Sequence, residues 1–332
     1  MKDSSLSLND STENVQDEFA EWDTIETISA VKDALALYHD VEMIEADENA
    51  FEKLRKSKPE IVFNIAEGKN GISREAQIPA MLDMLGIPCT GSDALTLATC
   101  LDKARSKEIL SYHKIPTAKF FKIENISELD NIEINFPVFI KPNAEGSSKG
   151  IFNESYICCM EDLKSKLQKY LSIYKQPFIV EEYLPGREFT VAVLGNNGDA
   201  RVLPIVEINF HGLPKEMKPI YSFETKWIYD TRETPLDIFT CPANIDAQLE
   251  QKISSHVLRT YRVLNCRDWS RIDVRMDTNG EPNIIEVNPL PGILPDPIDN
   301  SCFPKAARTA GIDYNEMINS VLIAAAKRQG LL

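Results

Sequence analysis

The segment "RIDVRMDTNGEPNIIEVN", residues 271–288, restricts the fold of this chain more than any other stretch. The pair Asn279-Gly280 is a strong hairpin signal, because both residues tolerate the positive φ of a type I′ turn. A two-residue turn centred there pairs Asp273 with Glu286 and Arg271 with Asn288 on adjacent strands. Like charges directly across a ladder destabilise a sheet, so either a cation lies beside the two carboxylates or the register is a different one.

Side chains alternate between the faces of a strand, so this hairpin has a polar face and an apolar face. The apolar face is predicted to pack in a core. The polar face offers two carboxylates and an amide, which are hard oxygen ligands for Mg²⁺, and an arginine that can hold an anion bidentately. A surface network of salt bridges is the competing interpretation of the same residues. The polar face is Arg271, Asp273, Glu286 and Asn288, and the apolar face is Ile272, Val274, Ile285 and Val287.

The chain as a whole excludes several classes of protein. At 332 residues it exceeds one typical core, so two or three lobes are expected. The formal charge of -15 argues against nucleic acid and anionic membranes as partners, because both need a basic surface. No run approaches ~18 apolar residues and no signal core is present, so a cytoplasmic protein is predicted. Seven scattered cysteines and four separated histidines support neither a disulfide framework nor a histidine-ligated metal.

The order of apolar patterns predicts an α/β and α+β protein built from lobes. Residues 1–18 are polar and are predicted to be disordered. Residues 19–95 alternate helical and extended patterns and predict a small parallel α/β lobe, followed by a central lobe at 96–185 and a C-terminal lobe at 186–332. The patterns also predict strands at "VEMIEA" and "EIVFNIAEG", one helix across "LTLATCLDKARSKEILSYH", and a final helix from about Ala306 to Arg328.

Two further motifs carry polar chemistry. In "KPNAEGSSKG", Lys141 leaves a strand and enters a loop of small residues whose backbone N–H groups and hydroxyls can approach a phosphate. A plain surface turn is the alternative, since neither a Walker A spacing nor a GxGxxG motif occurs. In "VEEYLPGREF", carboxylates flank a link between strands and could bind an adenine edge and ribose hydroxyls, or simply form an acidic surface. These carboxylates are Glu181, Glu182 and Glu188.

Taken together, several segments resemble the D-alanine:D-alanine ligase group of the ATP-grasp superfamily, in order and at compatible spacings from about residue 60 to the C-terminus. The stretch "IPCTGSDALTLATCLDKARSK" and the hairpin are the most specific of them. The resemblance implies a three-lobed fold in which ATP lies between two α+β lobes. The other segments are "FIKPNAEGSSKGI", "VEEYLPGREFTVAVLG", "ETKWIYD" and "FPKAARTAG".

The resemblance also implies a role for each matching residue. Phosphates would be contacted by Lys103, Lys141 and Lys226, under a loop that carries Ser147 and Ser148. Adenine would be bound by Glu181 and by the backbone of Glu182 and Leu184, and ribose by Glu188. Two Mg²⁺ ions, with Mn²⁺ as an alternative, would be held by Asp273, Glu286 and Asn288. Catalysis would involve Arg271, Lys226, Ser147 and the Gly292 backbone, and Ser301 would receive the carboxylate of the second substrate.

The sequence departs from that family pattern around the amino-acid pocket. The family's N-terminal strand and its substrate-gripping glutamate are absent from residues 1–18, and Glu26 or Glu67 is the expected substitute. Trp227 stands where the family has a tyrosine hydroxyl that ties a loop to the substrate. The loop before Ser301 is longer by several residues. These departures concern the amino acids joined and leave the nucleotide and metal residues intact.

The sequence therefore predicts an ATP-dependent ligase that joins two amino acids through an acyl phosphate, with D-alanine:D-alanine ligation as the first activity to consider. A ligase for other amino acids or a specialised metabolite, and a nucleotide-binding protein without catalysis, are the alternatives. The expected partners are small amino-acid substrates. Because family members commonly pair through the N-terminal lobe, a homodimer is also considered.

Overall fold

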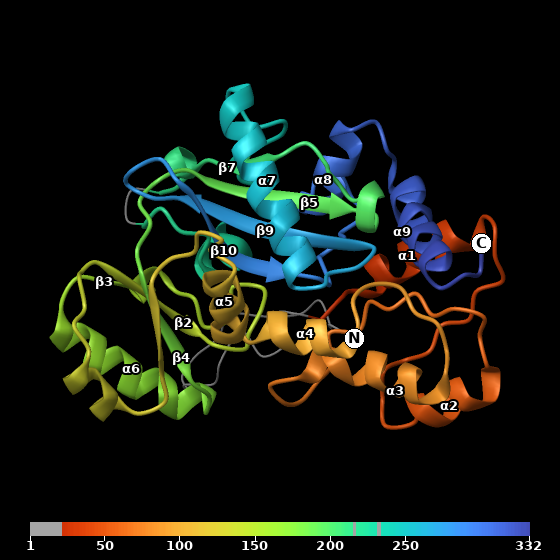
Figure 1. Ribbon diagram of the computed structural model, residues 1–332, viewed down its shortest axis with the longest axis horizontal. Coiled ribbons are helices and arrows are strands. Elements are labelled where there is room, and N and C mark those ends of the chain that lie inside the picture. The colour runs from red at the N-terminus through yellow and green to blue at the C-terminus, as the bar shows by residue number, and fades with distance from the viewer. Residues whose placement is uncertain (1–21, 215–216, 231–233) are drawn as a thin grey trace.

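The computed structural model describes residues 22–214, 217–230 and 234–332, and within these ranges the chain forms two antiparallel sheets (Figure 1). The segment 1–18, predicted to be disordered, lies outside the described residues. Both sheets border one cavity, so their placement decides which side chains can meet there.

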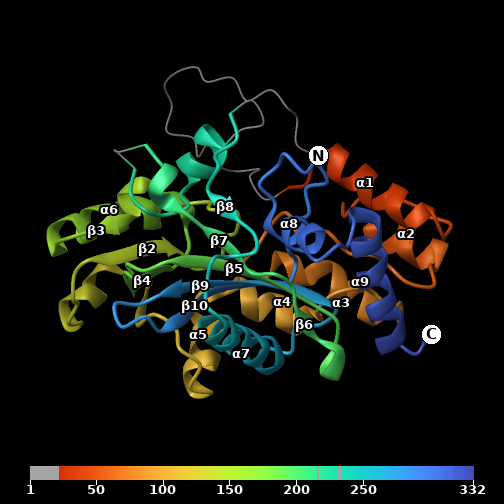
Figure 2. The same ribbon diagram turned by 90° about the horizontal axis from the view of Figure 1, so that it is seen from above.

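The larger sheet has six strands in the order β10-β9-β5-β7-β8, with β6 paired to β5. Its two faces are covered by different helices, α7 (Ala247–Val263) on one side and α8 (Cys302–Thr309) on the other (Figure 2). Buried side chains alternate between these faces along β5 and β9, as the strand period requires. The strands are β5 (Glu188–Leu194), β6 (Arg201–Val202), β7 (Val206–Ile208), β8 (Phe239–Thr240), β9 (Trp269–Met276) and β10 (Pro282–Asn288).

The smaller sheet has four strands in the order β1-β4-β2-β3. Helix α6 (Met160–Tyr174) packs on one face through Leu163, Leu167 and Tyr170. The Pro185-Gly186 link, predicted from the sequence, carries the chain from β4 of this sheet into β5 of the larger one, so residues on both sides of the link reach the same cavity. The strands are β1 (Phe120–Ile123), β2 (Val138–Pro142), β3 (Tyr156–Ile157) and β4 (Phe178–Glu182).

The N-terminal region contains helices but no sheet among its described residues. The predicted strands at 41–46 and 60–68 run as extended chain, and the pairing found is one parallel bridge between Val62 and Cys89. An apolar run specifies a strand only where a neighbouring strand supplies hydrogen bonds, so the predicted strands are wrong here. Residues 41–46 are not buried either, since Met43 is 53% exposed, whereas most of residues 61–68 are half-buried. The helices are α1 (Ile25–Ala36), capped by Thr24, α2 (Ala50–Ser57) and α3 (Gln77–Leu85), which ends at Gly86.

Two helices that the sequence predicts as continuous are interrupted. The first divides into α4 (Ala94–Leu101) and α5 (Lys103–Tyr112), because Asp102 adopts an extended conformation and its side chain accepts from the Arg105 N–H as an N-cap. Lys103 thereby becomes the first residue of a helix that points at the cavity. The last helix divides into α8 and α9 (Tyr314–Arg328), where Gly311 has a φ of +80° and Asp313 caps α9.

The hairpin of β9 and β10 keeps the predicted pairs, Asp273 with Glu286 and Arg271 with Asn288, but not the predicted turn. At the tip, Met276 pairs with Pro282, so the connection is longer than two residues, and Gly280 has a positive φ whereas Asn279 does not. A bulge between Ile284 and Glu286 restores the register further down the strand.

The bulge also corrects the predicted apolar face of this hairpin. Ile284, 1% exposed, joins Ile272, Val274 and Val287 in the core, whereas Ile285 lines the cavity.

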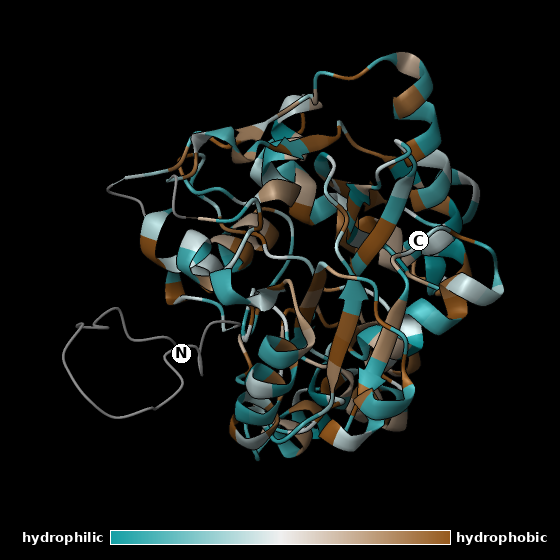
Figure 3. Cartoon of the chain, turned by 90° about the vertical axis from the view of Figure 1, so that its left-hand side faces the viewer, coloured by the Kyte–Doolittle hydropathy of each residue, from teal (hydrophilic) through white to brown (hydrophobic). Residues whose placement is uncertain are grey.

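Hydrophobic colouring concentrates on the central strands in Figure 3, in agreement with the buried clusters on the two sheets. Across the described residues, no helix combines the length and the apolar character needed to cross a bilayer.

Candidate active site

One cavity of about 280 Å³ brings together the residues that the sequence singles out, although they come from widely separated segments. Their presence around one space supports the predicted grouping, while the individual roles stay predictions. The residues that line it are Glu67, Lys103, Lys141, Ser147, Ser148, Glu181, Glu182, Leu184, Glu188, Lys226, Trp227, Arg271, Asp273, Glu286, Asn288, Gly292 and Ser301.

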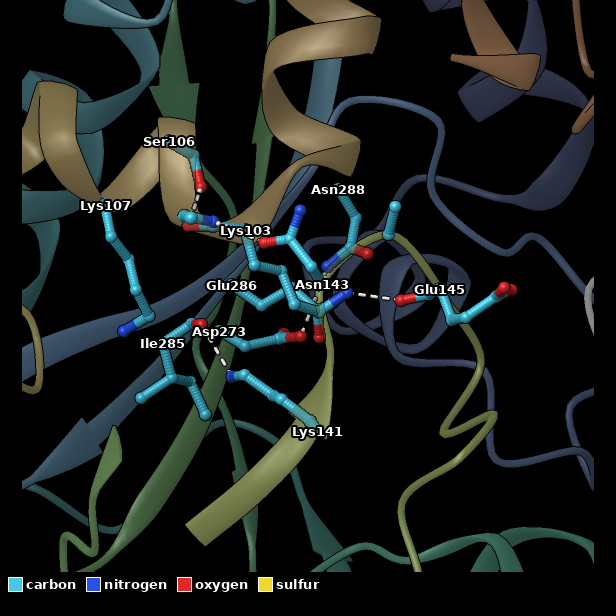
Figure 4. Close-up of polar contacts among 12 residues, drawn as sticks. Lys103, Ser106, Lys107, Lys141, Asn143, Glu145, Asp273, Ile285, Glu286 and Asn288 are labelled. Atoms are coloured by element: carbon cyan, nitrogen blue, oxygen red, sulfur yellow. Dashed lines mark hydrogen bonds and ion pairs between the residues drawn. The ribbon is translucent and has the colours of Figure 1, made fainter. Parts of the chain in front are cut away.

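Lys103 reaches the hairpin from the first turn of α5. Its Nζ lies 2.9 Å from Glu286 Oε1 and also donates to the carbonyl of Glu145 (Figure 4). Lys103 is 3% exposed, so this ion pair is shielded from solvent. Burial raises the pKa of Glu286, but Lys103 and Lys141 outweigh it and hold the pKa at about 2. Glu286 is therefore ionised at neutral pH.

Glu181 lies between two lysines in the interior. Its Oε1 is 2.8 Å from Lys141 Nζ and its Oε2 is 3.0 Å from Lys107 Nζ, and all three side chains are buried. Burial raises the pKa of Glu181, but the two lysine charges reverse the shift and lower it. Lys141 also donates to the carbonyl of Ile285, the residue released by the bulge, over 3.3 Å (Figure 4). The bulge thus links the smaller sheet to the hairpin.

The polar face of the hairpin is balanced by the protein's own cations. Arg271 holds Asp273 in two contacts, Nε to Oδ1 at 3.1 Å and Nη2 to Oδ2 at 2.9 Å. Thr190 donates to Asp273 Oδ1 over 2.6 Å, and Asn288 donates to Oδ2 over 3.3 Å. Each of the facing carboxylates therefore has a basic neighbour, which removes the repulsion expected from their register.

These oxygen donors fit a magnesium ion that is shared with a phosphate ligand. Asp273, Glu286 and Asn288 project from neighbouring strand positions into the cavity, and hard oxygen donors of this kind suit Mg²⁺. Within the described ranges, no group of three or more His, Cys, Asp or Glu side chains that could hold a metal ion by itself occurs. The set therefore suits an ion that completes its shell with oxygens from a ligand and from water.

The loop at 143–151 is already fastened to the opposite lobe. Ser148 donates its hydroxyl to the Tyr221 carbonyl over 2.9 Å, and Trp227 donates its indole N–H to the Ser147 carbonyl over 3.2 Å. Both serines have positive φ, 50° and 60°, which turns the backbone sharply at this point. Trp227 and Lys226 lie in a π-helical turn, Thr225–Tyr229, a conformation often found at functional sites. The indole N–H thus supplies a tie across the loop.

Ser301 organises the loop that follows the hairpin. Its hydroxyl donates to the Gly292 carbonyl over 3.1 Å and accepts from the Leu294 N–H over 3.2 Å. A substrate carboxylate at Ser301 would therefore compete with these two bonds. The lengthened stretch before Ser301 is anchored separately, because Asn300 donates to Asp230 Oδ1 over 2.7 Å.

The part of the cavity wall that comes from the N-terminal lobe is mainly acidic. Among residues 22–95, the cavity is lined by one aromatic and three acidic side chains, Trp22, Asp23, Glu67 and Glu75, hereafter the N-terminal wall. Asp23 has no hydrogen-bond or ion-pair partner among the described residues, and burial raises its pKa to about 6. Of the two glutamates considered as substrate-gripping residues, Glu67 lines the cavity, whereas Glu26 is exposed on α1 and does not.

Sequence reasoning missed three residues at this site. Lys107 follows Lys103 by four positions, the helical spacing that places both side chains on one side of α5. Arg275 follows Asp273 by two positions and so shares its strand face. Both signals were present in the sequence. Asp23 carried no signal, because its burial comes from tertiary packing that brings it near Tyr314 of α9.

The comparisons with known proteins agree with this architecture. The chain resembles the crystal structure of D-alanine–D-alanine ligase from Bacillus anthracis complexed with ATP, with a TM-score of 0.68 and 23% identity over 93% of this chain and 96% of that one. It also resembles VanG D-Ala:D-Ser ligase from Enterococcus faecalis, with a TM-score of 0.63 and 26% identity over 80% and 73%. The fold is therefore the ATP-grasp fold, as the sequence predicts.

Sequence matches narrow the class further. The family model described as D-ala D-ala ligase C-terminus matches residues 108–323. The D-alanine–D-alanine ligase of Actinobacillus pleuropneumoniae is 33% identical over 299 residues, 89% of this chain and 90% of that protein. Uncharacterized protein y4sG of Sinorhizobium fredii is 33% identical over 298 residues, covering 87% and 84%. The chain belongs to the D-alanine–D-alanine ligase family.

Proposed function

We propose that this protein is an ATP-dependent carboxylate-amine ligase that joins two amino acids through an acyl phosphate. The observation that carries the proposal is the convergence of Lys103, Lys141, Lys226 and Arg271 on one cavity, beside the hairpin carboxylates. Such a set of fixed cations suits a triphosphate, because phosphoryl transfer depends mainly on positioning and charge neutralisation.

The part of the cavity beside the link between the two sheets suits a nucleoside. Leu184 is 4% exposed and lines the cavity, and its N–H has no acceptor among the described residues. A ring nitrogen of adenine would accept from that N–H, and the adenine amino group would donate to the neighbouring Glu182 carbonyl. Glu188 also lines the cavity and is available to ribose hydroxyls.

The residues support a two-step reaction. In the first step, the carboxylate of one amino acid attacks the γ-phosphorus of ATP, and ADP leaves. In the second step, the amine of the other amino acid attacks the acyl phosphate carbon, phosphate leaves, the amine loses a proton and an amide remains. Mg²⁺ held by Asp273, Glu286 and Asn288 would supply further charge neutralisation at the phosphates.

Arg271 and Gly292 are suited to hold the oxyanion of the second step. Arg271 uses Nε and Nη2 on Asp273, and its Nη1 has no acceptor among the described residues. The Gly292 N–H is likewise without an acceptor there, and both residues line the cavity. Donors that are fixed before the reaction stabilise such an oxyanion strongly. Closure of the loop at 143–151, tied by Trp227, would protect the acyl phosphate from water.

The test is a screen of D- and L-amino acids for release of ADP and phosphate with ATP and Mg²⁺. D-alanine comes first, because the similar proteins of Actinobacillus pleuropneumoniae and Haemophilus influenzae are named D-alanine–D-alanine ligases. Release that depends on other amino acids would support a ligase of different specificity, which the N-terminal wall and the lengthened loop favour. Binding of ATP without release under any amino acid would overturn ligation and leave a nucleotide-binding protein.

Three finer features are part of the same proposal. A pair of magnesium ions is expected and can be counted by titration with Mn²⁺ in the presence of a non-hydrolysable nucleotide. A homodimer through the N-terminal lobe is supported by Leu37 and Tyr38, which are 56% and 74% exposed at the end of α1, and sedimentation tests it. A cytoplasmic location is expected for an enzyme that consumes ATP.

A further inference from the structure

Arg275 on β9 connects segments that surround the proposed nucleoside site. Its side chain is 8% exposed and lines the cavity. The Nη1 atom donates to Glu188 Oε2 over 2.7 Å, and Nη2 donates to the Tyr183 hydroxyl over 3.0 Å and to the Pro219 carbonyl over 2.7 Å. One guanidinium therefore joins β5, the link between the two sheets, and the segment that leads to Lys226.

Aromatic contacts fix the guanidinium of Arg275 further. Its Cζ atom lies 5.0 Å from the centroid of the Tyr183 ring and 5.4 Å from that of the Phe210 ring. Contacts of a guanidinium with aromatic rings are favourable and are strongest where water is excluded. The side chain is thus held by hydrogen bonds and by rings, and it has little freedom to move when a ligand enters.

The consequence concerns Glu188, which is 7% exposed. Arg275 holds its Oε2 atom, whereas Oε1 has no hydrogen-bond partner among the described residues and remains available to a ligand in the cavity. Burial raises the pKa of Glu188, and the charge of Arg275 opposes that shift. Arg275 therefore favours the ionised carboxylate, which accepts hydrogen bonds from hydroxyl groups more strongly than a neutral one.

We infer that Arg275 is a positioning residue that, by holding Oε2 of Glu188, aims Oε1 at the ribose hydroxyls and makes the protein select ribonucleotides. This inference rests on the proposed nucleotide site. It assigns to Arg275 no contact with the reacting atoms. Its signature is a loss of discrimination between ATP and deoxy-ATP, which a purely structural arginine would not produce.

The experiment measures binding of ATP, 2′-deoxy-ATP and 3′-deoxy-ATP by calorimetry. Wild-type protein is expected to bind ATP about 10- to 100-fold more tightly than at least one deoxy nucleotide, the range for a hydrogen bond to a charged group. E188Q and R275M should both reduce that ratio to within about 3-fold, and the double variant should reduce it no further, because both residues act through one carboxylate.

R187M is the matched control. Arg187 also pairs with a glutamate, Glu207 at 2.7 Å, and contacts an aromatic ring, Phe189 at 5.1 Å, but it does not line the cavity. Its nucleotide ratio should equal that of the wild type. In R275K one ammonium group cannot make all three contacts, so an intermediate ratio is expected.

A wild-type ratio in R275M, even with a lower melting temperature, overturns the inference, and so does a wild-type protein that binds all three nucleotides equally. If R275M fails to fold, a wild-type ratio of ATP to deoxy-ATP affinity in R275K also overturns the inference. These results are separate from the proposed ligation. A protein that discriminates ribose but joins no amino acids retains the inference, whereas a protein that binds no ATP loses the nucleotide site itself.

Discussion

The two walls of the cavity differ in how their charges are balanced. On one wall of the cavity, formed by α5, β2, β4, β5 and the hairpin and hereafter called the paired wall, three carboxylates contact cations. Glu181 contacts Lys107 and Lys141, Glu188 contacts Arg275, and Glu286 contacts Lys103. On the N-terminal wall, Asp23 has no such partner among the described residues and its pKa is raised to about 6. The three carboxylates of the paired wall therefore have cations before any ligand binds, whereas, within the described ranges, Asp23 does not.

The difference indicates how the two walls serve ligands. A pre-arranged set of paired charges reorganises little when a nucleotide binds. An unbalanced carboxylate costs stability unless a ligand supplies the missing charge. The comparison predicts that substitutions on the paired wall have large effects and substitutions on the N-terminal wall have smaller effects of a different sign.

The largest expected effect is that of E286Q. Glutamine cannot balance Lys103 and offers the proposed metal a neutral oxygen, so amino-acid-dependent ADP release should fall by about 10³-fold or more. Coupled measurement of ADP release gives the result. E281Q is the control, since Glu281 pairs with Lys252 on the exposed side of the same hairpin and should retain full activity. Full activity in E286Q would defeat the metal assignment.

K107M tests whether the paired wall depends on every charge. Lys107 is 2% exposed and holds both Glu181 and the Thr117 hydroxyl, so its loss should lower the free energy of unfolding by about 2–4 kcal/mol. Urea unfolding measures the change. K53M, which removes an exposed pair with Asp47, should change stability by less than about 0.5 kcal/mol. Equal effects in the two variants would show that burial of the pair is unimportant.

D23N should increase the free energy of unfolding, whereas K107M should lower it. The pKa of Asp23 is raised from 3.8 to about 6 by burial, so the folded state binds more protons than the unfolded state between these values, and stability falls as pH rises through the window. Asparagine removes this penalty. The variant should be more stable than the wild type by about 1–2 kcal/mol at pH 8, with no difference near pH 4.

Urea unfolding at both pH values gives the result for D23N. D40N, at an exposed position of the same lobe, serves as the control. A D23N protein that is less stable than the wild type at pH 8 would mean that the folded protein already compensates the charge of Asp23.

The smallest effect is expected for W227F, which keeps a ring and removes the N–H that donates to Ser147. A neutral hydrogen bond of this kind contributes about 1 kcal/mol, so the ratio of phosphate released to amide formed should rise by about 3- to 10-fold. W227Y, which offers a hydroxyl again, should lie closer to the wild type. An unchanged ratio in W227F would show that the loop at 143–151 is held without this tie.

Sequence reasoning succeeded where chemistry is encoded locally. The pairing of Asp273 with Glu286, the Pro-Gly link and the position of Lys141 follow from period-two alternation and short motifs, and that pairing is confirmed. The individual roles at the site stay predictions. Arg275 could have been found by extending the same alternation from Asp273 by one step.

The misses share a physical cause, which is dependence on distant segments. The break at Asp102 ends α4 and caps α5, and Lys103, the first residue of α5, then meets Glu286 from a distant segment. The segments 41–46 and 60–68 are predicted as strands because an apolar run looks the same whether or not a neighbouring strand is present to pair with it. The raised pKa of Asp23 arises from packing that no local pattern reports.

The bulge at Ile285 separates the two ends of the hairpin. Without it, the pairing set at the tip would continue down the hairpin and would put Glu286 opposite Ile272, on the face that packs in the core. With it, Glu286 lies opposite Asp273 on the cavity face, and the Ile285 carbonyl accepts from Lys141. A single unpaired residue thus decides whether this carboxylate meets a ligand or the hydrophobic interior.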